Sequence, residues 1–244
     1  MKKAYLNWSS GKDAALALYK ALQNKNIGIG KLVTTVNTEV DRISMHGLRK
    51  ELLLQQVENI GLPLQLIPLH GAVSMQEYNA AMKEATAALI AEGFTHSIFG
   101  DIFLEDLRVY RDEQLKLAEL EGIYPLWKQN SVGLMEEFLK LGFKAITVCT
   151  NSRLLDSSFC GRIIDADFLK ELPEGVDLCG ENGEFHTFVY DGPIFKKPVE
   201  FTVGEKVERT YTARNSKEEN CFKDEAEESW DTGFCYCDLI PNKQ

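Results

Sequence analysis

The sequence predicts an α/β fold, in which a parallel sheet carries helices on both faces and a smaller C-terminal α+β domain follows. Strand-like and helix-like segments alternate through the first half of the chain, which is typical of a parallel sheet covered by helices. The pattern changes after Pro125-Leu126-Trp127, where loops and shorter strands take over. We therefore expect a first domain over residues 1–128 and a second over residues 129–244.

The segments of the first domain follow from the spacing of apolar residues. Expected strands cover residues 4–8, 31–37, 63–69 and 97–102. Expected helices cover residues 13–22, 46–60 and 105–121, and one more carries the apolar stripe Met75, Tyr78, Met82, Ala85 and Leu89. The stripe recurs at helical spacing, so we interpret it as part of the core.

The second half is expected to be less regular. A helix near residues 132–141 precedes a strand over 145–149 and a loop-rich region that glycines interrupt. Seven acidic residues between positions 216 and 231 predict a solvated loop. Further strands are expected over residues 199–203, 207–211 and 234–240.

Composition and charge favour some classes of protein and disfavour others. Of the 244 residues, 44% are hydrophobic and 10% aromatic, which favours a globular protein. No apolar run approaches the roughly 18 residues of a membrane span and no leader is visible, so we expect a cytoplasmic protein without a membrane partner. A net charge of −10 without a basic patch disfavours nucleic acid as a partner.

Six cysteines, at positions 149, 160, 179, 221, 235 and 237, are expected to be reduced and mostly buried. Soft thiolates also suit zinc. A site made by Cys221, Cys235 and Cys237 therefore stays open, although no neighbouring cluster of Cys and His supports it.

The turn between the first strand and the first helix, Ser9-Ser10-Gly11-Lys12-Asp13, has the chemistry of a phosphate site. The unpaired N–H groups of a first helical turn attract anions, and Gly11 lets the backbone approach them closely. Serine hydroxyls add donors, and Lys12 adds positive charge. The spacing is not that of a Walker A loop. A plain capped turn is the alternative, because Ser and Asp cap helices in any protein.

This turn resembles the Ser-Gly-Gly-Lys-Asp-Ser loop of the N-type ATP pyrophosphatases, also called PP-loop enzymes. Further segments, spread over roughly residues 4–195, resemble one branch of that group, the diphthine-ammonia ligase family and its prokaryotic relatives. These segments are Ser44-Met45-His46, Gly100-Asp101-Ile102 with Leu107-Arg108, Pro125-Leu126-Trp127, and Gly180-Glu181-Asn182-Gly183-Glu184-Phe185-His186-Thr187.

The resemblance implies the Rossmann-like fold of the adenine nucleotide alpha hydrolase-like superfamily and a specific chemistry. ATP binds at residues 9–13, a carboxylate acceptor attacks its α-phosphate, pyrophosphate leaves, and ammonia displaces AMP to form an amide. Mg²⁺ bridging the phosphates is implied as well. The sequence does not identify the acceptor, which a protein can carry, and a homodimer stays open.

Two aspartates are candidates for holding the metal. Asp13 belongs to the loop itself, and Asp101 ends the fourth expected strand, at the edge where parallel sheets bind ligands. Asp101 is also a candidate catalytic residue. Glu181 and Glu184 are further catalytic candidates, because charges in a glycine-punctuated loop are often free to act. Plain turn chemistry is their alternative.

Two more catalytic candidates have a structural alternative. Arg108 is a candidate contact for phosphate or substrate carboxylate, and its alternative is a solvated arginine on a charged helix. His46 is a candidate general base or substrate contact, and its alternative is an ordinary residue at a helix start.

The chain departs from the family pattern at four positions. Ser10 stands where glycine is frequent, and Ala14 stands where serine is usual, which removes one hydroxyl donor. Asn182 and His186 replace a glycine and an acid in the last motif. A histidine charges only near or below a pKa of about 6.5, so we expect activity to depend on pH through His186.

Two other functions stay open. One is a tRNA-modifying enzyme of the same ATP superfamily, although its thiolating members commonly use paired cysteines and a basic surface, which this sequence does not display. The other is a non-catalytic nucleotide sensor. Release of AMP and pyrophosphate distinguishes an enzyme from such a sensor.

Overall fold

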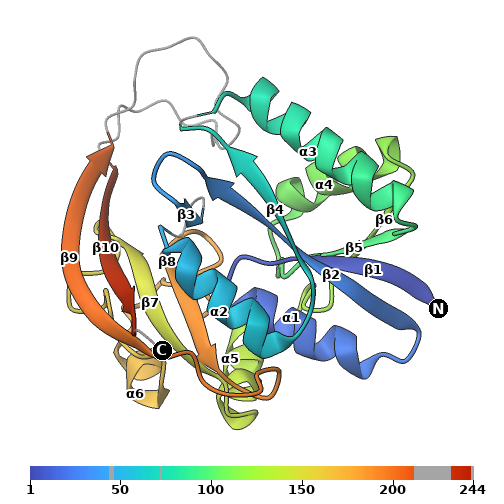
Figure 1. The fold of residues 1–244 in the computed structure, drawn as a ribbon. Helices are drawn as coiled ribbons and strands as arrows, with labels where there is room; N and C mark the ends of the chain where they lie inside the picture. Colours follow the sequence, from blue (N-terminus) through green and yellow to red (C-terminus); the bar gives the residue numbers. More distant parts are fainter. Residues whose placement is uncertain (44–46, 72, 212–231, 243–244) are drawn as a thin grey trace.

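The computed structural model describes residues 1–43, 47–71, 73–211 and 232–242. Its first sheet has strand order β3-β2-β1-β5-β6, with β4 also paired to β2 (Figure 1). All pairings are parallel except that of β2 with β3, so the predicted parallel sheet is confirmed. The strands are β1 (Lys2–Asn7), β2 (Ile27–Asn37), β3 (Arg42–Ile43), β4 (Leu64–Leu69), β5 (His96–Ile98) and β6 (Glu121–Ile123).

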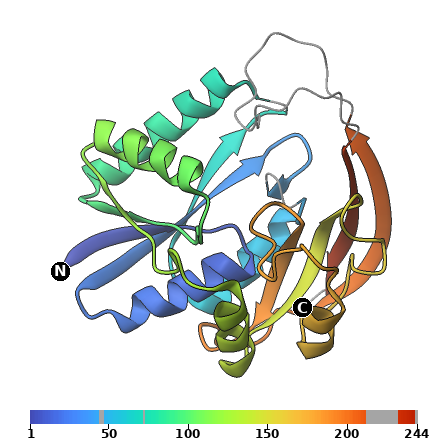
Figure 2. The same cartoon turned by 180° about the vertical axis from the view of Figure 1, so that it is seen from behind.

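Helices lie on both faces of this sheet, as predicted (Figures 1 and 2). The four helices concerned are α1 (Lys12–Gln23), α2 (Lys50–Ile60), α3 (Met75–Ala91) and α4 (Glu105–Leu117). Tyr5 of β1 packs in a cluster with Leu89 of α3 and Leu115 of α4. Its neighbours Ala4 and Leu6 belong instead to the cluster that contains α1 and α2. This division follows from the two-residue period of a strand.

The smaller C-terminal unit is built on an antiparallel sheet with strand order β8-β7-β10-β9. It confirms the predicted α+β part of the fold. Its elements are α5 (Ser131–Lys140), β7 (Lys144–Asn151), α6 (Ala166–Glu171), β8 (Phe185–Asp191), β9 (Phe201–Tyr211) and β10 (Thr232–Pro241).

Several element boundaries differ from those expected. α4 ends at Leu117 rather than at residue 121, because Glu119 adopts a left-handed conformation (φ 56°) that stops the helix. Of the apolar stripe on α3, Ala85 and Leu89 are buried, whereas the other three members are only half-buried. β5 ends at Ile98, four residues early, because the chain then crosses the start of α1.

The second half is more regular than expected. The separate strands expected over 199–203 and 207–211 form the single strand β9. β8 occupies part of the region expected to be loop-rich. The acidic stretch at 216–231 lies outside the described residues.

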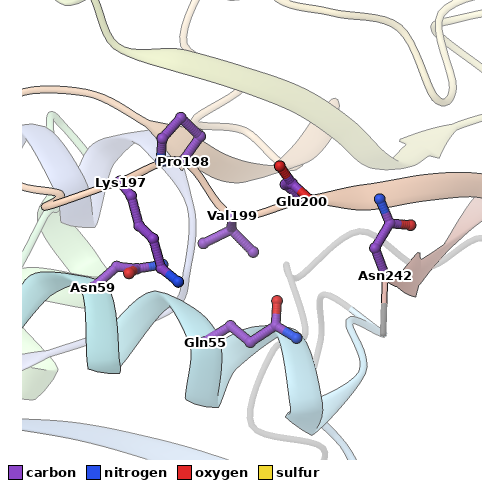
Figure 3. A pocket seen from close by; sticks show the side chains of 7 residues that line it. All are labelled: Gln55, Asn59, Lys197, Pro198, Val199, Glu200 and Asn242. Atoms are coloured by element: carbon purple, nitrogen blue, oxygen red, sulfur yellow. The ribbon is translucent and has the colours of Figure 1, made fainter. Parts of the chain in front are cut away.

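The two sheets are joined through α2 and the segment before β9. The Lys196 N–H donates to the Asn59 carbonyl at 2.9 Å. Beside this contact, a cavity of about 180 Å³ is lined by Gln55 and Asn59 of α2, residues 197–200 and Asn242 (Figure 3).

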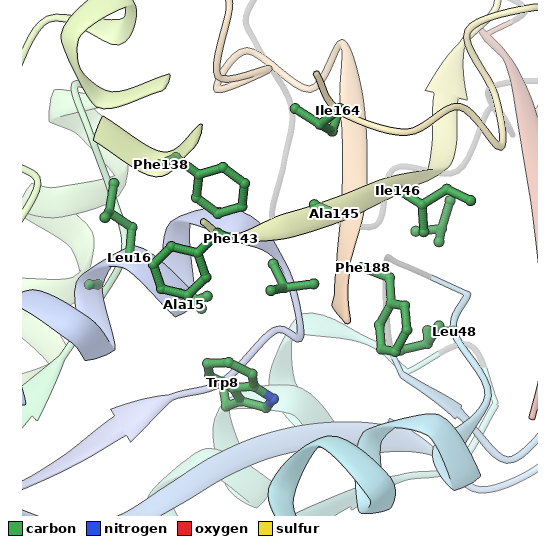
Figure 4. Close-up of a cluster of buried hydrophobic side chains, with 14 of the residues drawn as sticks. Trp8, Ala15, Leu16, Leu48, Phe138, Phe143, Ala145, Ile146, Ile164 and Phe188 are labelled. Carbon is green, nitrogen blue, oxygen red and sulfur yellow. The ribbon is translucent and has the colours of Figure 1, made fainter. Parts of the chain in front are cut away.

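The main core lies between the two sheets. Trp8 at the end of β1, Leu16 of α1 and Phe188 of β8 belong to one buried cluster (Figure 4). Phe138 and Phe143 stack in the same cluster, with ring centroids 4.9 Å apart. This core contains residues from both sides of position 128, and the two-domain division stays a prediction.

Two further sequence expectations concern membranes and cysteines. No helix among the described residues is long and apolar enough to cross a membrane. The cysteines at positions 149, 160, 179, 235 and 237 are free and buried. In the part of the chain that the structure describes, no three His, Cys, Asp or Glu side chains are grouped to hold a metal ion. Cys221 lies outside that part, so the zinc site with Cys221 stays a prediction.

Candidate functional site

The predicted phosphate loop connects β1 to α1. Gly11 is the N-cap of α1, with extended backbone and no side chain to cap the first turn. Ser9 lies beside it, half-buried, and its hydroxyl is 3.4 Å from the Gly11 nitrogen. Ser10 has a φ of 69°. Glycine adopts this left-handed conformation freely, whereas another residue adopts it at a cost of about 1–2 kcal/mol. The conformation explains why the family pattern favours glycine at this position.

The Lys12 side chain points into the protein. It is 3% exposed. Its Nζ donates to the two Asp13 carboxylate oxygens, at 2.9 and 2.7 Å, and to the Cys179 carbonyl. Burial opposes the charge, but the carboxylate of Asp13 raises the pKa of Lys12 above its usual value. The Lys12 ammonium therefore links the phosphate loop to Cys179, the residue before the last family motif. The Ser10 hydroxyl donates to the Ser9 carbonyl, so the Gly11 N–H and the Ser9 hydroxyl are left as the expected phosphate donors.

The last motif of the family pattern lies directly against this loop. The Lys12 N–H donates to the Thr187 hydroxyl at 3.0 Å. The Val189 N–H donates to the Ser10 carbonyl, also at 3.0 Å. β8 of the second sheet therefore fixes the backbone of the loop that follows β1 of the first sheet.

Gln56 of α2 supports the loop from another side. Its amide is fully buried. Oε1 accepts from the Trp8 indole at 3.1 Å, while Nε2 donates to the Ser10 carbonyl at 3.1 Å and to the Val189 carbonyl at 2.5 Å. A buried amide is tolerated only when it is hydrogen-bonded, and these three contacts satisfy it. Gln56 was not predicted from the sequence, because its only signal is a polar residue on the apolar face of a helix.

The backbone of Asp13 lies against the segment after β5 that carries Asp101. A Cβ on Gly100 would lie 2.8 Å from the Asp13 carbonyl carbon, so glycine is required for this approach. Burial raises the pKa of both aspartates, and the charge of Asp13 further raises that of Asp101. The two metal candidates therefore lie close enough to interact electrostatically.

Arg111 of α4 holds Asp101 in place. Its Nε lies 2.7 Å from Asp101 Oδ2, and its Nη2 donates to Oδ1 at 3.3 Å. The Oδ2 contact is an ion pair without hydrogen-bond alignment. The guanidinium also stacks on Phe99, 4.5 Å from the ring centroid. Arg111 was not predicted from the sequence. Its one signal is the i,i+3 spacing from Arg108, which places both arginines on one face of the helix.

Arg108 lies between two aromatic rings. Its guanidinium carbon is 4.5 Å from the Tyr124 ring centroid and 4.4 Å from that of Trp127. Its Nε pairs with Asp112 at 3.4 Å. Its charge also lowers the pKa of Asp101, although less than Arg111 does. Arg108 is thus packed near the site rather than fully solvated.

Glu181 brings the last motif to the end of β5. Its Oε1 accepts from the Ile102 N–H at 2.7 Å and from the Phe103 N–H at 3.4 Å. Burial is the main cause that raises the pKa of Glu181 to about 7, and the charges of Asp13 and Asp101 add to it. Glu181 therefore lies within electrostatic reach of both metal candidates.

Glu184 faces its own loop. It is 2% exposed. Its carboxylate accepts from the Asp177 N–H at 3.0 Å and from the backbone and side-chain nitrogens of Asn182 at 2.9 and 3.0 Å. These contacts place Glu184 where its carboxylate stabilises its own turn. Its catalytic role stays a prediction.

Of His186 and His46, the structure describes only His186. Burial, together with the nearby charge of Lys12, lowers the pKa of His186 to about 4. This ring is therefore neutral at pH 7, and a transition near pH 6.5 is not expected from it. His46 lies outside the described residues.

Two family models match the chain, and together they cover most of it. Residues 1–115 match the diphthamide synthase N-terminal domain, and residues 130–240 match the diphthamide synthase C-terminal domain.

This chain belongs to the diphthamide synthase family. Curated relatives in this family include the diphthine–ammonia ligases of Bos taurus, 32% identical over 105 residues, and of Homo sapiens, 30% identical over 105 residues. Each match covers 41% of this chain and 39% of the relative. The ligase of Schizosaccharomyces pombe is 29% identical over 134 residues, which are 53% of this chain and 22% of that protein. The chain thus spans two fifths or less of the length of these relatives.

Proposed function

We propose that this diphthamide synthase family member binds ATP at residues 9–13 and uses it to activate a carboxylate for amide formation with ammonia. The observation that carries the proposal is the contact between the phosphate loop and the last family motif, made by the Lys12 N–H and the Thr187 hydroxyl. It supports a single site, with the nucleotide on the first sheet and the acceptor beside the second. Curated relatives named diphthine–ammonia ligase support the same reaction class.

In the proposed reaction, an acceptor carboxylate oxygen attacks the α-phosphorus of ATP. The bond to the bridging α,β-oxygen breaks, and pyrophosphate leaves. Ammonia then attacks the acyl carbon, the bond to AMP breaks, and an amide and AMP result while a proton is lost. Such chemistry needs alignment and charge stabilisation more than covalent help from the protein.

The residues present suit a divalent cation beside the phosphates. Mg²⁺ is usually held by one or two carboxylates together with substrate phosphates, rather than by a cage of protein ligands. Asp13 lies close enough to raise the pKa of Asp101, and Asp101 Oδ2, which is 2.7 Å from Arg111 Nε, is buried without an aligned hydrogen bond. We therefore assign these two aspartates to Mg²⁺, which would neutralise charge that develops on the phosphates.

The other predicted residues receive roles that follow their positions. Glu181 of the last family motif accepts from the Ile102 N–H, in the segment that carries Asp101. We assign Glu181 to binding the ammonium that supplies the amide nitrogen. Lys12 keeps its predicted role at the phosphates and Glu184 its predicted catalytic role, and their contacts also position the loops that carry the reacting groups. Arg108 keeps its predicted role as a contact for phosphate or substrate carboxylate, and His46 keeps its predicted role as a general base or substrate contact. We further propose that residues 1–128 and 129–244 are the nucleotide-side and acceptor-side domains, and that the protein, whose described cysteines are free thiols, is cytoplasmic.

The test is identification of the products of ATP turnover. The protein is incubated with Mg·ATP and a panel of carboxylate acceptors, diphthine included, with and without ammonium. We expect AMP and pyrophosphate in equal amounts, formed faster with ammonium, and a much lower rate in Glu181→Gln with ATP affinity retained. ADP and inorganic phosphate as the products would contradict the proposal. ATP binding without turnover of any acceptor would favour the sensor function.

A further inference from the structure

A second cavity, of about 510 Å³, opens between the start of α2 and the β9–β10 pair. This volume is typical of sites that hold a small organic ligand. The cavity is lined by Arg42, Arg49, Gly204, Glu205, Val207, Asp238 and Ile240. None of these residues belongs to the phosphate loop or to the last family motif.

Two arginines in this cavity share one carboxylate. Arg49 donates from Nε to Asp238 Oδ1 at 3.0 Å and from Nη2 to Oδ2 at 2.6 Å. Arg42 donates from Nη2 to the same Oδ1, also at 3.0 Å. Burial alone would raise the pKa of Asp238, yet the hydrogen bonds from the two arginines hold it below its usual value. The carboxylate is thus ionised, and it fixes two guanidinium groups side by side.

The two arginines retain hydrogen-bond donors for a further anion. A guanidinium has five N–H donors. Among the described contacts, Arg49 uses two of them on Asp238, and Arg42 uses one on Asp238 and one on the Gly47 carbonyl. The cavity lining carries two positive charges, on Arg42 and Arg49, and two negative charges, on Asp238 and Glu205, so the unused guanidinium donors rather than an excess of charge would hold an anion. The side chains of Arg42 and Arg49 remain 33% and 38% exposed, so a ligand can reach them.

The rest of the cavity suits an organic anion rather than a bare ion. Val207 and Ile240 line the cavity and are each 43% exposed, which gives it an apolar wall. Arg49 is also the N-cap residue of α2, and no side chain caps that helix. Glu51 in the first turn of α2 offsets the positive end of the helix dipole, so the two arginines are the main anion-binding groups of the cavity.

We propose that this cavity is a binding site for an organic oxyanion, a carboxylate or phosphate ester with a small apolar body, gripped by Arg42 and Arg49. Guanidinium forks match both headgroups in bidentate geometry. Asp238 is the positioning residue that pre-organises the two forks, which lowers the cost of ordering them on binding. The site is distinct from the phosphate loop, because Arg49 precedes Gln56 by seven residues, or about 10 Å along α2.

The test is a titration followed by NMR of the arginine side-chain Nε–H signals, which report on this cavity directly. The two probes are phenyl phosphate and benzoate, which share a ring and differ in headgroup, so that the tighter one identifies the headgroup. We expect saturable shifts of the Arg49 signal in the wild-type protein. Arg49→Gln should weaken binding, read from the Arg42 signal, about tenfold or more, because it removes charge-assisted hydrogen bonds.

A further variant distinguishes a ligand site from an ion-pair cluster that only joins β3 and α2 to β10. Glu205→Gln keeps the size of the side chain and removes a negative charge from the cavity wall, so it should tighten binding severalfold. Absence of saturable binding to both probes, or weaker binding in Glu205→Gln, would overturn the proposal. These results are independent of ATP binding, which is measured separately.

Discussion

The backbone N–H of Lys12 donates to the hydroxyl of Thr187 at 3.0 Å, across 175 positions of sequence. The preceding residue, Gly11, has no side chain with which to cap α1. The first N–H groups of a helix have no partner within it. The Thr187 hydroxyl supplies the acceptor that an N-cap side chain would otherwise provide. This bond joins the phosphate loop to the second sheet.

Replacing Thr187 should lower the free energy of unfolding, because its hydroxyl holds the phosphate loop. Thr187→Val keeps the shape and leaves the buried Lys12 N–H without an acceptor, so we expect a loss of about 1–2 kcal/mol in the free energy of unfolding. Thr187→Ser keeps the hydroxyl and should retain most of the stability. Urea denaturation measures both. Equal stability of the valine variant and the wild type would show that the bond contributes nothing.

Gly100 should not tolerate a side chain. In Gly100→Ala, the new Cβ would lie 2.8 Å from the Asp13 carbonyl carbon, so α1 and the end of β5 must move apart. We expect a loss of about 1–3 kcal/mol in stability, together with weaker ATP binding. Gly133→Ala is the matched control, since its Cβ would meet nothing within 4 Å. If the two alanine variants unfold at the same urea concentration, the close approach is not as described.

Lys12 should matter for stability as well as for binding. Lys12→Met leaves the Asp13 carboxylate and the Cys179 carbonyl without their buried partner, and we expect a loss of roughly 2–4 kcal/mol. The control on the same helix is Lys20→Met. It removes a more exposed pair with Glu137, which should cost no more than about 1 kcal/mol. Equal unfolding free energies for the two variants would argue that the Lys12 ammonium does not clamp the loop.

His186 should make the protein less stable in acid. Its pKa in the folded chain is lowered to about 4, whereas an unfolded histidine has a pKa near 6.5. The unfolded state therefore binds a proton first as the pH falls, and stability present above about pH 6.5 is lost progressively toward pH 4, by up to about 3 kcal/mol. The difference in unfolding free energy between the wild type and His186→Gln isolates this effect. A difference that stays constant from pH 7 to pH 4 would contradict it.

The sequence predicted the first sheet well because local patterns determine it. Apolar strands alternate with amphipathic helices, and Ser9-Ser10-Gly11-Lys12-Asp13 spans the turn after β1 and the start of α1, where expected. Segment boundaries were less predictable. β5 ends early because Gly100 lies against the backbone of Asp13, which is a contact between distant segments.

The partners within the candidate site could not be predicted from sequence. Nothing local indicates that Lys12 reaches the Cys179 carbonyl or that Gln56 ties Ser10 to Val189. Such contacts depend on how the second sheet packs against the first. For the same reason the sequence identified Glu184 as a charged loop residue without showing that its carboxylate faces its own turn.

The claim that residues 9–13 hold ATP is tested most directly by calorimetric titration of Mg·ATP into the wild type, Gly11→Val and the control Gly133→Ala. The account predicts a single binding site in the wild type and in the control. It predicts an affinity at least about tenfold lower in Gly11→Val, because the valine side chain blocks the approach of phosphate to the first turn of α1. Equal affinity in all three proteins, or no binding to the wild type, would contradict it.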